Sequence, residues 1–291
     1  MRRKKITAFD VVVHMIGALL LIVVLYPLIL VVSCSISDPQ LVATGQVLLL
    51  PKGITFDGYA QIFKNQDILI GYGNTIFYTF FGTLINLAVT VPAGYALTKK
   101  SLPDGKFFTG FFMFIMYFSG GLIPTFLVVN GLGLYNTRMV LLILGAFNTY
   151  NCIICRTFFV SMPKELEEAA IIDGCSVIGT FVKVILPLSK ALLGVMVLYF
   201  AVAHWNSYFN AMIYIREDAM QPLQVFLRRI LILAQQTADN AEAAEYAYSL
   251  ANLEAMMRYA VIVVSSLPLL IVYPFLQKYF DQGVMIGSVK G

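Results

Sequence analysis

Charged residues are scarce in this chain of 291 residues: Asp, Glu, Lys and Arg make up 12% of it, whereas 59% of the residues are hydrophobic. Soluble domains use about 25% charged and about 45–50% apolar residues. The composition therefore excludes an ordinary soluble domain and indicates a polytopic membrane protein, whose first partner is the lipid bilayer. The formal net charge is only +4, and we expect no nucleic-acid partner.

The long apolar stretches lack Asp, Glu, Lys and Arg at mid-membrane depth. Carriers driven by proton or sodium gradients usually need ionisable groups there. The chain also lacks the G-x-x-x-x-G-K-[ST] loop that binds ATP phosphates, and its apolar stretches hold no paired carboxylates, His cluster or nucleophile motif. We therefore expect no catalytic residue, metal or cofactor in this chain. If the chain takes part in transport, the energy must come from another subunit.

Cysteine is also rare, with four residues in the chain. Cys152 and Cys155 have C-x-x-C spacing, but buried cysteine more commonly behaves as a small hydrophobe than as a redox or metal pair. The apolar run 11–33 ends beside Cys34 in a sequence that loosely resembles a lipoprotein processing site. Its length favours a membrane span over a cleaved signal, whose apolar region has about 7–15 residues.

Six apolar segments reach the length of about 20 residues that a membrane-spanning helix needs. They are 11–33, 72–98, 107–129, 139–159, 189–211 and 259–280. If the N-terminus is inside, the inner segments hold thirteen of the 20 Lys and Arg residues, as the positive-inside rule requires. We predict an all-α polytopic membrane protein of six transmembrane helices with both termini in the cytoplasm. No internal repeat or linker divides residues 1–291, so we predict a single domain with an outer loop at 212–258 and a cytoplasmic tail at 281–291.

The connection at 162–187, between the fourth and fifth predicted spans, carries the signals of two helices. Ser161-Met162-Pro163 offers a cap and then a proline near the first helical position, and acidic residues follow in the early turns, where the helix dipole favours them. Gly174 supplies a stop, and a second helix is predicted from Ser176 until Pro187. Charge alone leaves two interpretations open, a solvated surface helix and a docking helix for a soluble partner.

Neutral polar residues and aromatic rings occur at depth in the predicted spans. Uncharged donors and acceptors suit a neutral polar cargo, and aromatic rings can stack on the apolar face of a sugar. The candidates for a substrate path are Asn86, Tyr117, Asn148, Tyr150, Asn151, His204, Trp205, Asn206 and Tyr208. Alternatively, Asn side chains join neighbouring helices and Trp and Tyr lie at the membrane interface. For His204, which has no His or Cys nearby, the helix-interface interpretation is favoured.

The order of residues within 162–187 favours the docking interpretation. Glu168-Ala169-Ala170, three residues, Gly174, nine residues and then Val184-x-Leu186-Pro187 resemble the E-A-A-x3-G-x9-I-x-L-P signature of permease subunits in bacterial ABC importers. Val184 in place of Ile is the one departure. Further similarities, which extend the resemblance over roughly residues 70–291, are Asn74-Thr75 opening the second span, Ala96-Leu97 closing it and Trp205-Asn206 in the fifth.

Within that family the chain is similar to maltose-type carbohydrate-uptake permeases of the oligosaccharide and complex-glycan branch. Its end, from Tyr273 to Phe280 and from Gly283 to Gly291, is similar to the tails of such permeases. The resemblance implies the type I ABC importer permease fold and a second homologous permease subunit. It also implies two cytoplasmic ATPase subunits that bind ATP and Mg, and an extracellular sugar-binding protein that faces the outer loop.

The resemblance further implies which residues couple this chain to the ATPase. The helix around Glu168 to Gly174 would lie in an ATPase cleft and transmit its motion to the spans of an alternating-access sugar importer. The implied coupling residues are Glu167, Glu168, Ala169, Ala170, Asp173, Gly174, Leu186 and Pro187, with Gly287, Lys290 and Gly291 in the tail. An ABC permease for a peptide or metal chelate is the alternative that keeps the docking helix. A membrane enzyme or a non-transporting scaffold would need no specific ATPase partner.

Overall fold

The computed structural model describes residues 7–99, 101–239, 257–274 and 277. Helices make up 77% of the structure, and the described residues include no strand. The chain forms two compact units, Met1–Ile68 with Phe226–Pro268 and Leu69–Val225 with Leu269–Gly291. The second unit contains the predicted docking segment and all the described candidates for a substrate path.

The first unit is dominated by the long helix α1, Ala8–Ser35. A capping box starts α1: the Asp10 amide donates to the Thr7 hydroxyl (3.4 Å) and the Thr7 amide donates to the Asp10 carboxylate (2.9 Å). Within the apolar part of α1, no residue is buried inside the unit. A helix that is apolar on every side is stable where lipid surrounds it. The short helices α2, Pro39–Ala43, and α3, Asp57–Lys64, follow.

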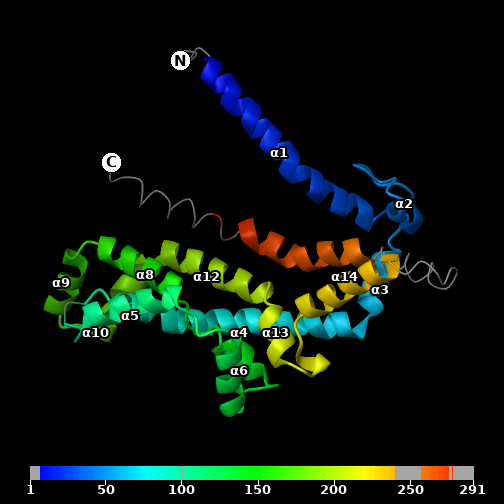
Figure 1. Cartoon of the computed structure of the whole chain (residues 1–291). Coiled ribbons are helices and arrows are strands. Elements are labelled where there is room, and N and C mark those ends of the chain that lie inside the picture. The colour runs from blue at the N-terminus through cyan, green and yellow to red at the C-terminus, as the bar shows by residue number, and fades with distance from the viewer. Residues whose placement is uncertain (1–6, 100, 240–256, 275–276, 278–291) are drawn as a thin grey trace. The chain divides into compact units, whose positions relative to one another are not determined.

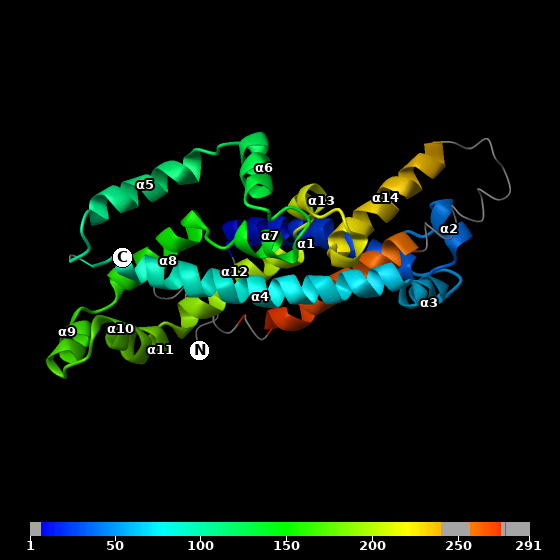
Figure 2. The same cartoon turned by 90° about the horizontal axis from the view of Figure 1, so that it is seen from below.

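The second unit is built along α4, Gln66–Ala96, which begins in the first unit. The elements that follow it in this unit are α5 (Gly105–Tyr117), α6 (Leu122–Gly131), α7 (Arg138–Ile143), α8 (Thr149–Ser161), α9 (Glu165–Ile172), α10 (Val177–Thr180), the π-helix η1 (Phe181–Ile185), α11 (Leu186–Leu188), α12 (Lys190–Trp205), α13 (Phe209–Tyr214) and the 3-10 helix η2 (Asp218–Met220). The next helix, α14 (Leu223–Asp239), begins in the second unit and continues in the first from Phe226. In both views, α9 and α10 lie at the end of the unit where α4 finishes (Figures 1 and 2).

Three described helices are long and apolar enough to cross a membrane: Phe9–Ser35, Gln66–Ala96 and Met257–Pro274. The number rises to five if each of two bent helix pairs counts as one span. The third predicted span, 107–129, corresponds to one of these pairs: α5 and α6 meet at 113°. Gly121, with φ +85°, lies at this break, in a conformation that is available to glycine at little cost.

The fourth and fifth predicted spans are not continuous helices. Residues 144–148 separate α7 from α8 within the predicted span 139–159, and residues 206–208 separate α12 from α13 within 189–211. At the first break the Asn148 side chain accepts a hydrogen bond from the Asn151 amide (2.9 Å) and so starts α8. Average hydropathy misses such breaks, because the residues around them are as apolar as the helices.

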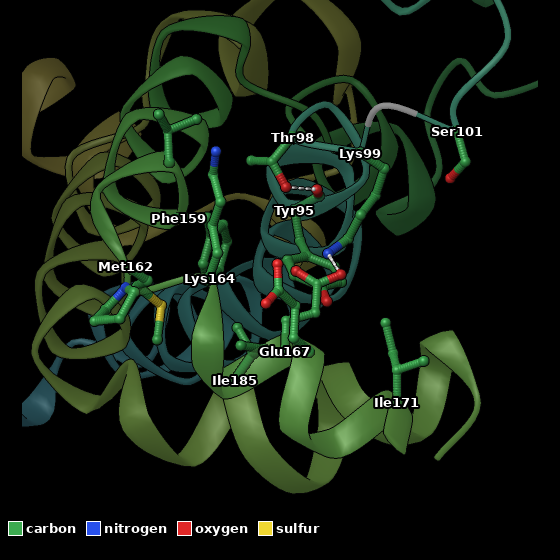
Figure 3. A pocket seen from close by; sticks show the side chains of 13 residues that line it. Tyr95, Thr98, Lys99, Ser101, Phe159, Met162, Lys164, Glu167, Ile171 and Ile185 are labelled. Atoms are coloured by element: carbon green, nitrogen blue, oxygen red, sulfur yellow. Dashed lines mark hydrogen bonds and ion pairs between the residues drawn. The ribbon is translucent and has the colours of Figure 1, made fainter. Parts of the chain in front are cut away.

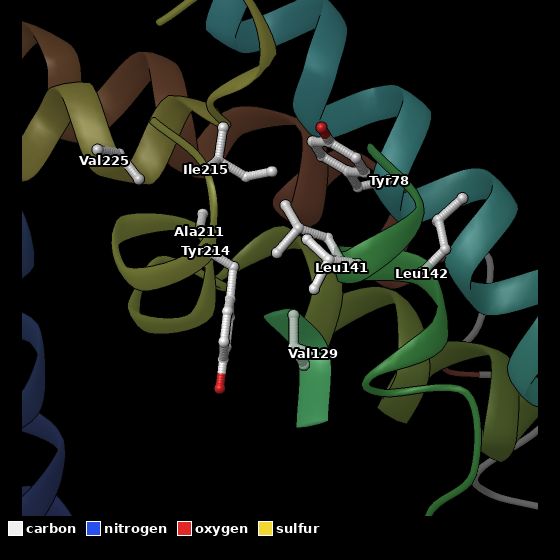
Figure 4. Packing of buried hydrophobic residues seen from close by; sticks show 9 residues of the cluster. Tyr78, Val129, Leu141, Leu142, Ala211, Tyr214, Ile215 and Val225 are labelled. Atoms are coloured by element: carbon white, nitrogen blue, oxygen red, sulfur yellow. The ribbon is translucent and has the colours of Figure 1, made fainter. Parts of the chain in front are cut away.

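Two buried clusters hold the second unit together. The first, near the middle of α4, joins Tyr78 to α7 through Leu141 and to α13 through Ala211 (Figure 4). The second joins the last turns of α4 to α8, η1 and α12, and contains Val91, Tyr95, Cys155, Phe159, Ile185, Leu192, Met196 and Phe200. This second cluster places the predicted docking segment on the end of the helix core. Cys152 and Cys155 are both buried and free, as the hydrophobe interpretation predicts.

Candidate coupling site

Helix α9 starts without the predicted side-chain cap. Ser161 is the last residue of α8, and its hydroxyl donates to the Phe158 carbonyl (2.7 Å). The residue before α9 is Lys164, which makes no side-chain cap. The prediction of a cap at Ser161 is therefore wrong, because Met162, Pro163 and Lys164 lie between it and the helix. Glu165, Glu167 and Glu168 do lie in the first turn, where the helix dipole favours acidic side chains.

Gly174 ends α9, as the sequence predicts. Its φ of +80° is in the left-handed region. The Cys175 amide donates to the Ala170 carbonyl (2.9 Å) and the Gly174 amide to the Ile171 carbonyl (3.0 Å). These two bonds are the Schellman arrangement, which satisfies carbonyls that a helix end leaves open. Gly174 and Asp173 are both exposed, so the turn is presented to the surroundings of the chain.

The second half of the segment is helical up to Leu188, one residue further than predicted. The Ser176 hydroxyl accepts from the Gly179 amide (3.1 Å) and starts α10. The next turn is a π-helix, directly before Leu186 and Pro187. Pro187 has no amide hydrogen to give to the preceding turn, a common cause of locally irregular helix. The chain then bends by 83° into α12.

The outer surface of this helical segment is apolar. Ile172 is 84% exposed and Ile178 76% exposed, and Ile171, Val177 and Val182 are also exposed. Glu168 and Ala169 of the signature lie exposed on the same short helix, whereas Ala170 is buried. Apolar side chains grouped with small and acidic residues outside a buried core are typical of a protein-binding surface.

A cavity of about 510 Å³ lies behind α9, between it and the ends of α4 and α8 (Figure 3). It is lined by Tyr95, Thr98, Lys99, Ser101, Phe159, Val160, Met162, Pro163, Lys164, Glu167, Glu168, Ile171 and Ile185. Lys99, just after α4, forms an ion pair with Glu167 of α9. The Lys99 Nζ also lies 3.7 Å from the centre of the Tyr95 ring. The sequence analysis used Lys99 only for orientation and missed this contact.

Two candidates for the substrate path, Asn86 and His204, contact each other. The Asn86 Oδ1 lies 2.7 Å from the His204 Nε2, and the Asn86 Nδ2 donates to the carbonyls of Gly145 and, at 3.0 Å, Ala146. The buried amide thus joins α4 to α12 and to the break between α7 and α8. These bonds agree with the helix-interface interpretation of His204 and give Asn86 a structural role.

The other candidates differ in their exposure and in their contacts. Asn148 starts α8 and Asn151 is buried near it, whereas Tyr117 and Tyr150 are 83% and 60% exposed. Trp205 is buried, and its ring meets that of Tyr72 edge-on at 5.9 Å. Asn206 is exposed and its Nδ2 donates to the Val202 carbonyl (3.0 Å), while Tyr208 is half-buried. Gly287, Lys290 and Gly291 lie outside the described residues.

The structure also gives a role to Asn74 and Thr75, which the sequence analysis used only as a point of resemblance. The Asn74 Nδ2 donates to the carbonyls of Ala219 (2.8 Å) and Gln221 (3.0 Å), and the Thr75 hydroxyl accepts from the Leu223 amide (2.8 Å). These side chains fasten the segment after α13 to α4. Only their polarity within an apolar helix could have indicated this from the sequence.

We predict that Asn86→Ala destabilises the protein by about 1–3 kcal/mol, because two partly buried carbonyls and His204 lose their partner. Thermal unfolding of the purified chain in detergent measures the effect. Asn206→Ala, which removes an exposed amide bonded only within its own helix, is the matched control and should change the melting temperature little. Equal melting temperatures for the two variants would contradict the structural role of Asn86.

The fold and the segment at 162–187 define a helical membrane protein with an exposed helical segment between its apolar helices. The chain belongs to the family of binding-protein-dependent transport system inner membrane components, whose model matches residues 68–286. It is therefore a multi-pass membrane protein and the transport component of its system, not the catalytic ATPase.

Individual relatives match over almost the whole chain. Protein LplC of Bacillus subtilis (strain 168) is 40% identical over 92% of this chain and 90% of the relative. The polygalacturonan/rhamnogalacturonan transport system permease protein YtcP of the same organism is 35% identical over 97% and 98%. A chain in the crystal structure of a bacterial ABC transporter involved in the import of the acidic polysaccharide alginate is 36% identical. That chain superposes with a TM-score of 0.84 over 96% of this chain and 100% of its own length.

Proposed function

We propose that this chain is the permease subunit of an ATP-driven, binding-protein-dependent importer of oligosaccharides that works by alternating access. The observation that carries the proposal is the signature segment at 162–187. It folds as a short helix pair, joined by the turn at Gly174, on the end of the helix core and exposes Glu168, Gly174 and an apolar surface. This geometry suits docking into a soluble energy-supplying subunit.

The cargo is proposed from the relatives. The permease YtcP is named for polygalacturonan and rhamnogalacturonan, and the similar crystal structure for the acidic polysaccharide alginate. These names support an oligosaccharide over a peptide or metal chelate. The name of the crystal structure refers to an acidic polysaccharide, whereas the uncharged spans predicted a neutral cargo. The decisive experiment must therefore include both neutral and uronic acid oligosaccharides.

We propose six spans with both termini in the cytoplasm. The three long helices, the bent pair of α5 and α6, and α12, which is the second half of the other bent pair, supply five candidates. The sixth is α7 and α8, whose break at 144–148 is stabilised by Asn86. Irregular backbone is tolerated at membrane depth where it is buried within protein. This orientation places α9 to α11 in the cytoplasm and the segment after α13 outside.

The proposed partners are a second homologous permease, two ATPase subunits that bind ATP and Mg, and an extracellular sugar-binding protein. The loop at 212–258 would face the binding protein. Docking of α9 into an ATPase cleft would carry closure of the ATPase dimer through η1 and the second buried cluster to α4 and α12. Gly287, Lys290 and Gly291 of the tail would add contacts with the ATPase.

ATP hydrolysis by the assembled complex tests this function. The chain is co-expressed with its neighbouring permease and a candidate ATPase, placed in lipid nanodiscs, and assayed with binding protein that is either empty or loaded with neutral or uronic acid oligosaccharides. We expect stimulation by one class of loaded binding protein. Failure of the chain to assemble with a verified cognate ATPase would contradict the proposal, whereas stimulation by peptide alone would overturn the cargo.

A further inference from the structure

We propose that Lys99 is a positioning residue for energy coupling: its ion pair with Glu167 ties the docking helix α9 directly to the end of α4. This inference rests on the proposed function and adds a second route for motion. The first route follows the chain from α9 through α10 and η1 to α12. The second crosses from Glu167 to Lys99 and enters α4 at its last turn.

Helix α9 needs such a tie because it has almost no apolar packing of its own. Of its eight residues, only Ala170 is buried. Ile171 lines the cavity behind the helix and is still 55% exposed. A helix this short is not stable by itself and depends on its tertiary contacts. Because α9 lies over this cavity, the ion pair between Lys99 and Glu167 at the cavity wall can fix the position of the helix.

The surroundings of Lys99 make this pair more than a surface contact. Fully exposed ion pairs contribute little, because water and salt screen them. The Lys99 side chain is 15% exposed and that of Glu167 32%. The Lys99 ammonium also rests on Tyr95, whose ring packs against Phe181 of η1 at 4.8 Å and Phe159 of α8 at 5.5 Å. Lys99 thus connects α9 with the cluster that joins α4, α8 and η1 (Figure 3).

Two adjacent glutamates consequently have different tasks. Glu168 belongs to the signature and is exposed, available to a partner. Glu167 lies outside the signature pattern and is paired within the chain. Reversal of one charge at the pair places two like charges together and should release α9 from α4. Reversal of both charges should restore the ion pair, with the acidic residue at position 99 and the basic residue at position 167.

Charge reversal in the nanodisc complex tests the tie. We expect Lys99→Glu and Glu167→Lys each to lower sugar-stimulated ATP hydrolysis by about fivefold or more, a typical size for coupling between sites. The double variant should recover to within about twofold of the wild type. The matched controls are Lys106→Glu and Glu165→Lys, both at exposed positions nearby, and they should change stimulation little. Single variants that behave like these controls, or a double variant no better than the singles, would overturn the proposal.

A second measurement does not depend on hydrolysis. Cys175 follows the turn that ends α9 and is half-exposed, whereas Cys34, Cys152 and Cys155 are buried. The rate of maleimide labelling at Cys175, followed by mass spectrometry in the same complexes without nucleotide, reports the position of this turn. We expect the rate to change about threefold or more in each single variant and to return in the double variant, since loss of a tie shifts local populations. Equal labelling rates in all the variants would overturn the proposed role of the ion pair. This result is informative even if the complex shows no stimulated hydrolysis, which would contradict the proposed function separately.

Discussion

Replacement of Gly174 by Asp is expected to abolish sugar-stimulated ATP hydrolysis while the chain still inserts and assembles. The glycine adopts φ +80° and no other atom lies within 4 Å of its missing Cβ, so the side chain would fit and point outward. The new carboxylate would enter the docking surface beside Asp173, at the unfavourable end of the helix dipole. A buried, unpaired carboxylate costs several kcal/mol, and each 1.4 kcal/mol is tenfold, so stimulation should fall about tenfold or more. The nanodisc ATPase assay measures the loss.

Gly174→Asn separates the charge from the backbone. Asparagine has nearly the shape of aspartate and is among the non-glycine residues that best tolerate positive φ. We expect this variant to keep most of the stimulation. Equal losses in the Asp and Asn variants would assign the effect to backbone strain, and full stimulation in Gly174→Asp would contradict the docking role of this turn.

The largest expected effect on stability comes from Gly94→Leu. A Cβ at Gly94 would lie 2.6 Å from the Cys155 Cβ and 3.1 Å from both the Arg156 amide nitrogen and the Cys152 carbonyl oxygen. Small residues let membrane helices approach this closely, and α4 packs on α8 here. Overpacking by a single small group costs about 1–3 kcal/mol, and leucine adds more, so we expect loss of the folded protein. Size-exclusion chromatography after detergent extraction measures the folded yield.

Gly73→Leu is the matched control on the same helix. Nothing lies within 4 Å of a Cβ at Gly73, which is exposed. This variant should give close to the wild-type yield of monodisperse protein. A folded, monodisperse Gly94→Leu variant would show that α4 and α8 are not in close contact at this point.

The docking segment could be predicted from the sequence because its signals are local. Gly174 stops α9 through its own backbone conformation, and Ser176 starts α10 through a hydrogen bond three residues away. Such features depend on neighbours in the chain and not on the rest of the fold. The predicted cap at Ser161 failed because the position of a helix start is uncertain by a few residues.

The tertiary contacts could not be predicted in the same way. Lys99 and Glu167 are 68 residues apart, and Asn86 and His204 are 118 apart. Their pairing depends on how the helices pack. The breaks at 144–148 and 206–208 were missed because hydropathy averages over a window and is insensitive to a helix interruption within an apolar stretch. Asn86, a polar residue within an apolar stretch of α4, was named as a candidate for the substrate path, but the sequence could not show whether its amide binds cargo or neighbouring carbonyl groups.

ATP-driven uptake into proteoliposomes tests the central claim most directly. The complete complex is reconstituted with its ATPase subunits facing the bath, so that sugar-loaded binding protein is enclosed in the vesicles and ATP is added outside. The account predicts that labelled oligosaccharide leaves the vesicles for the bath only with ATP, binding protein and this chain all present, and that Gly174→Asp stops this movement. Movement of oligosaccharide at the same rate without ATP, or with this chain omitted, would contradict it.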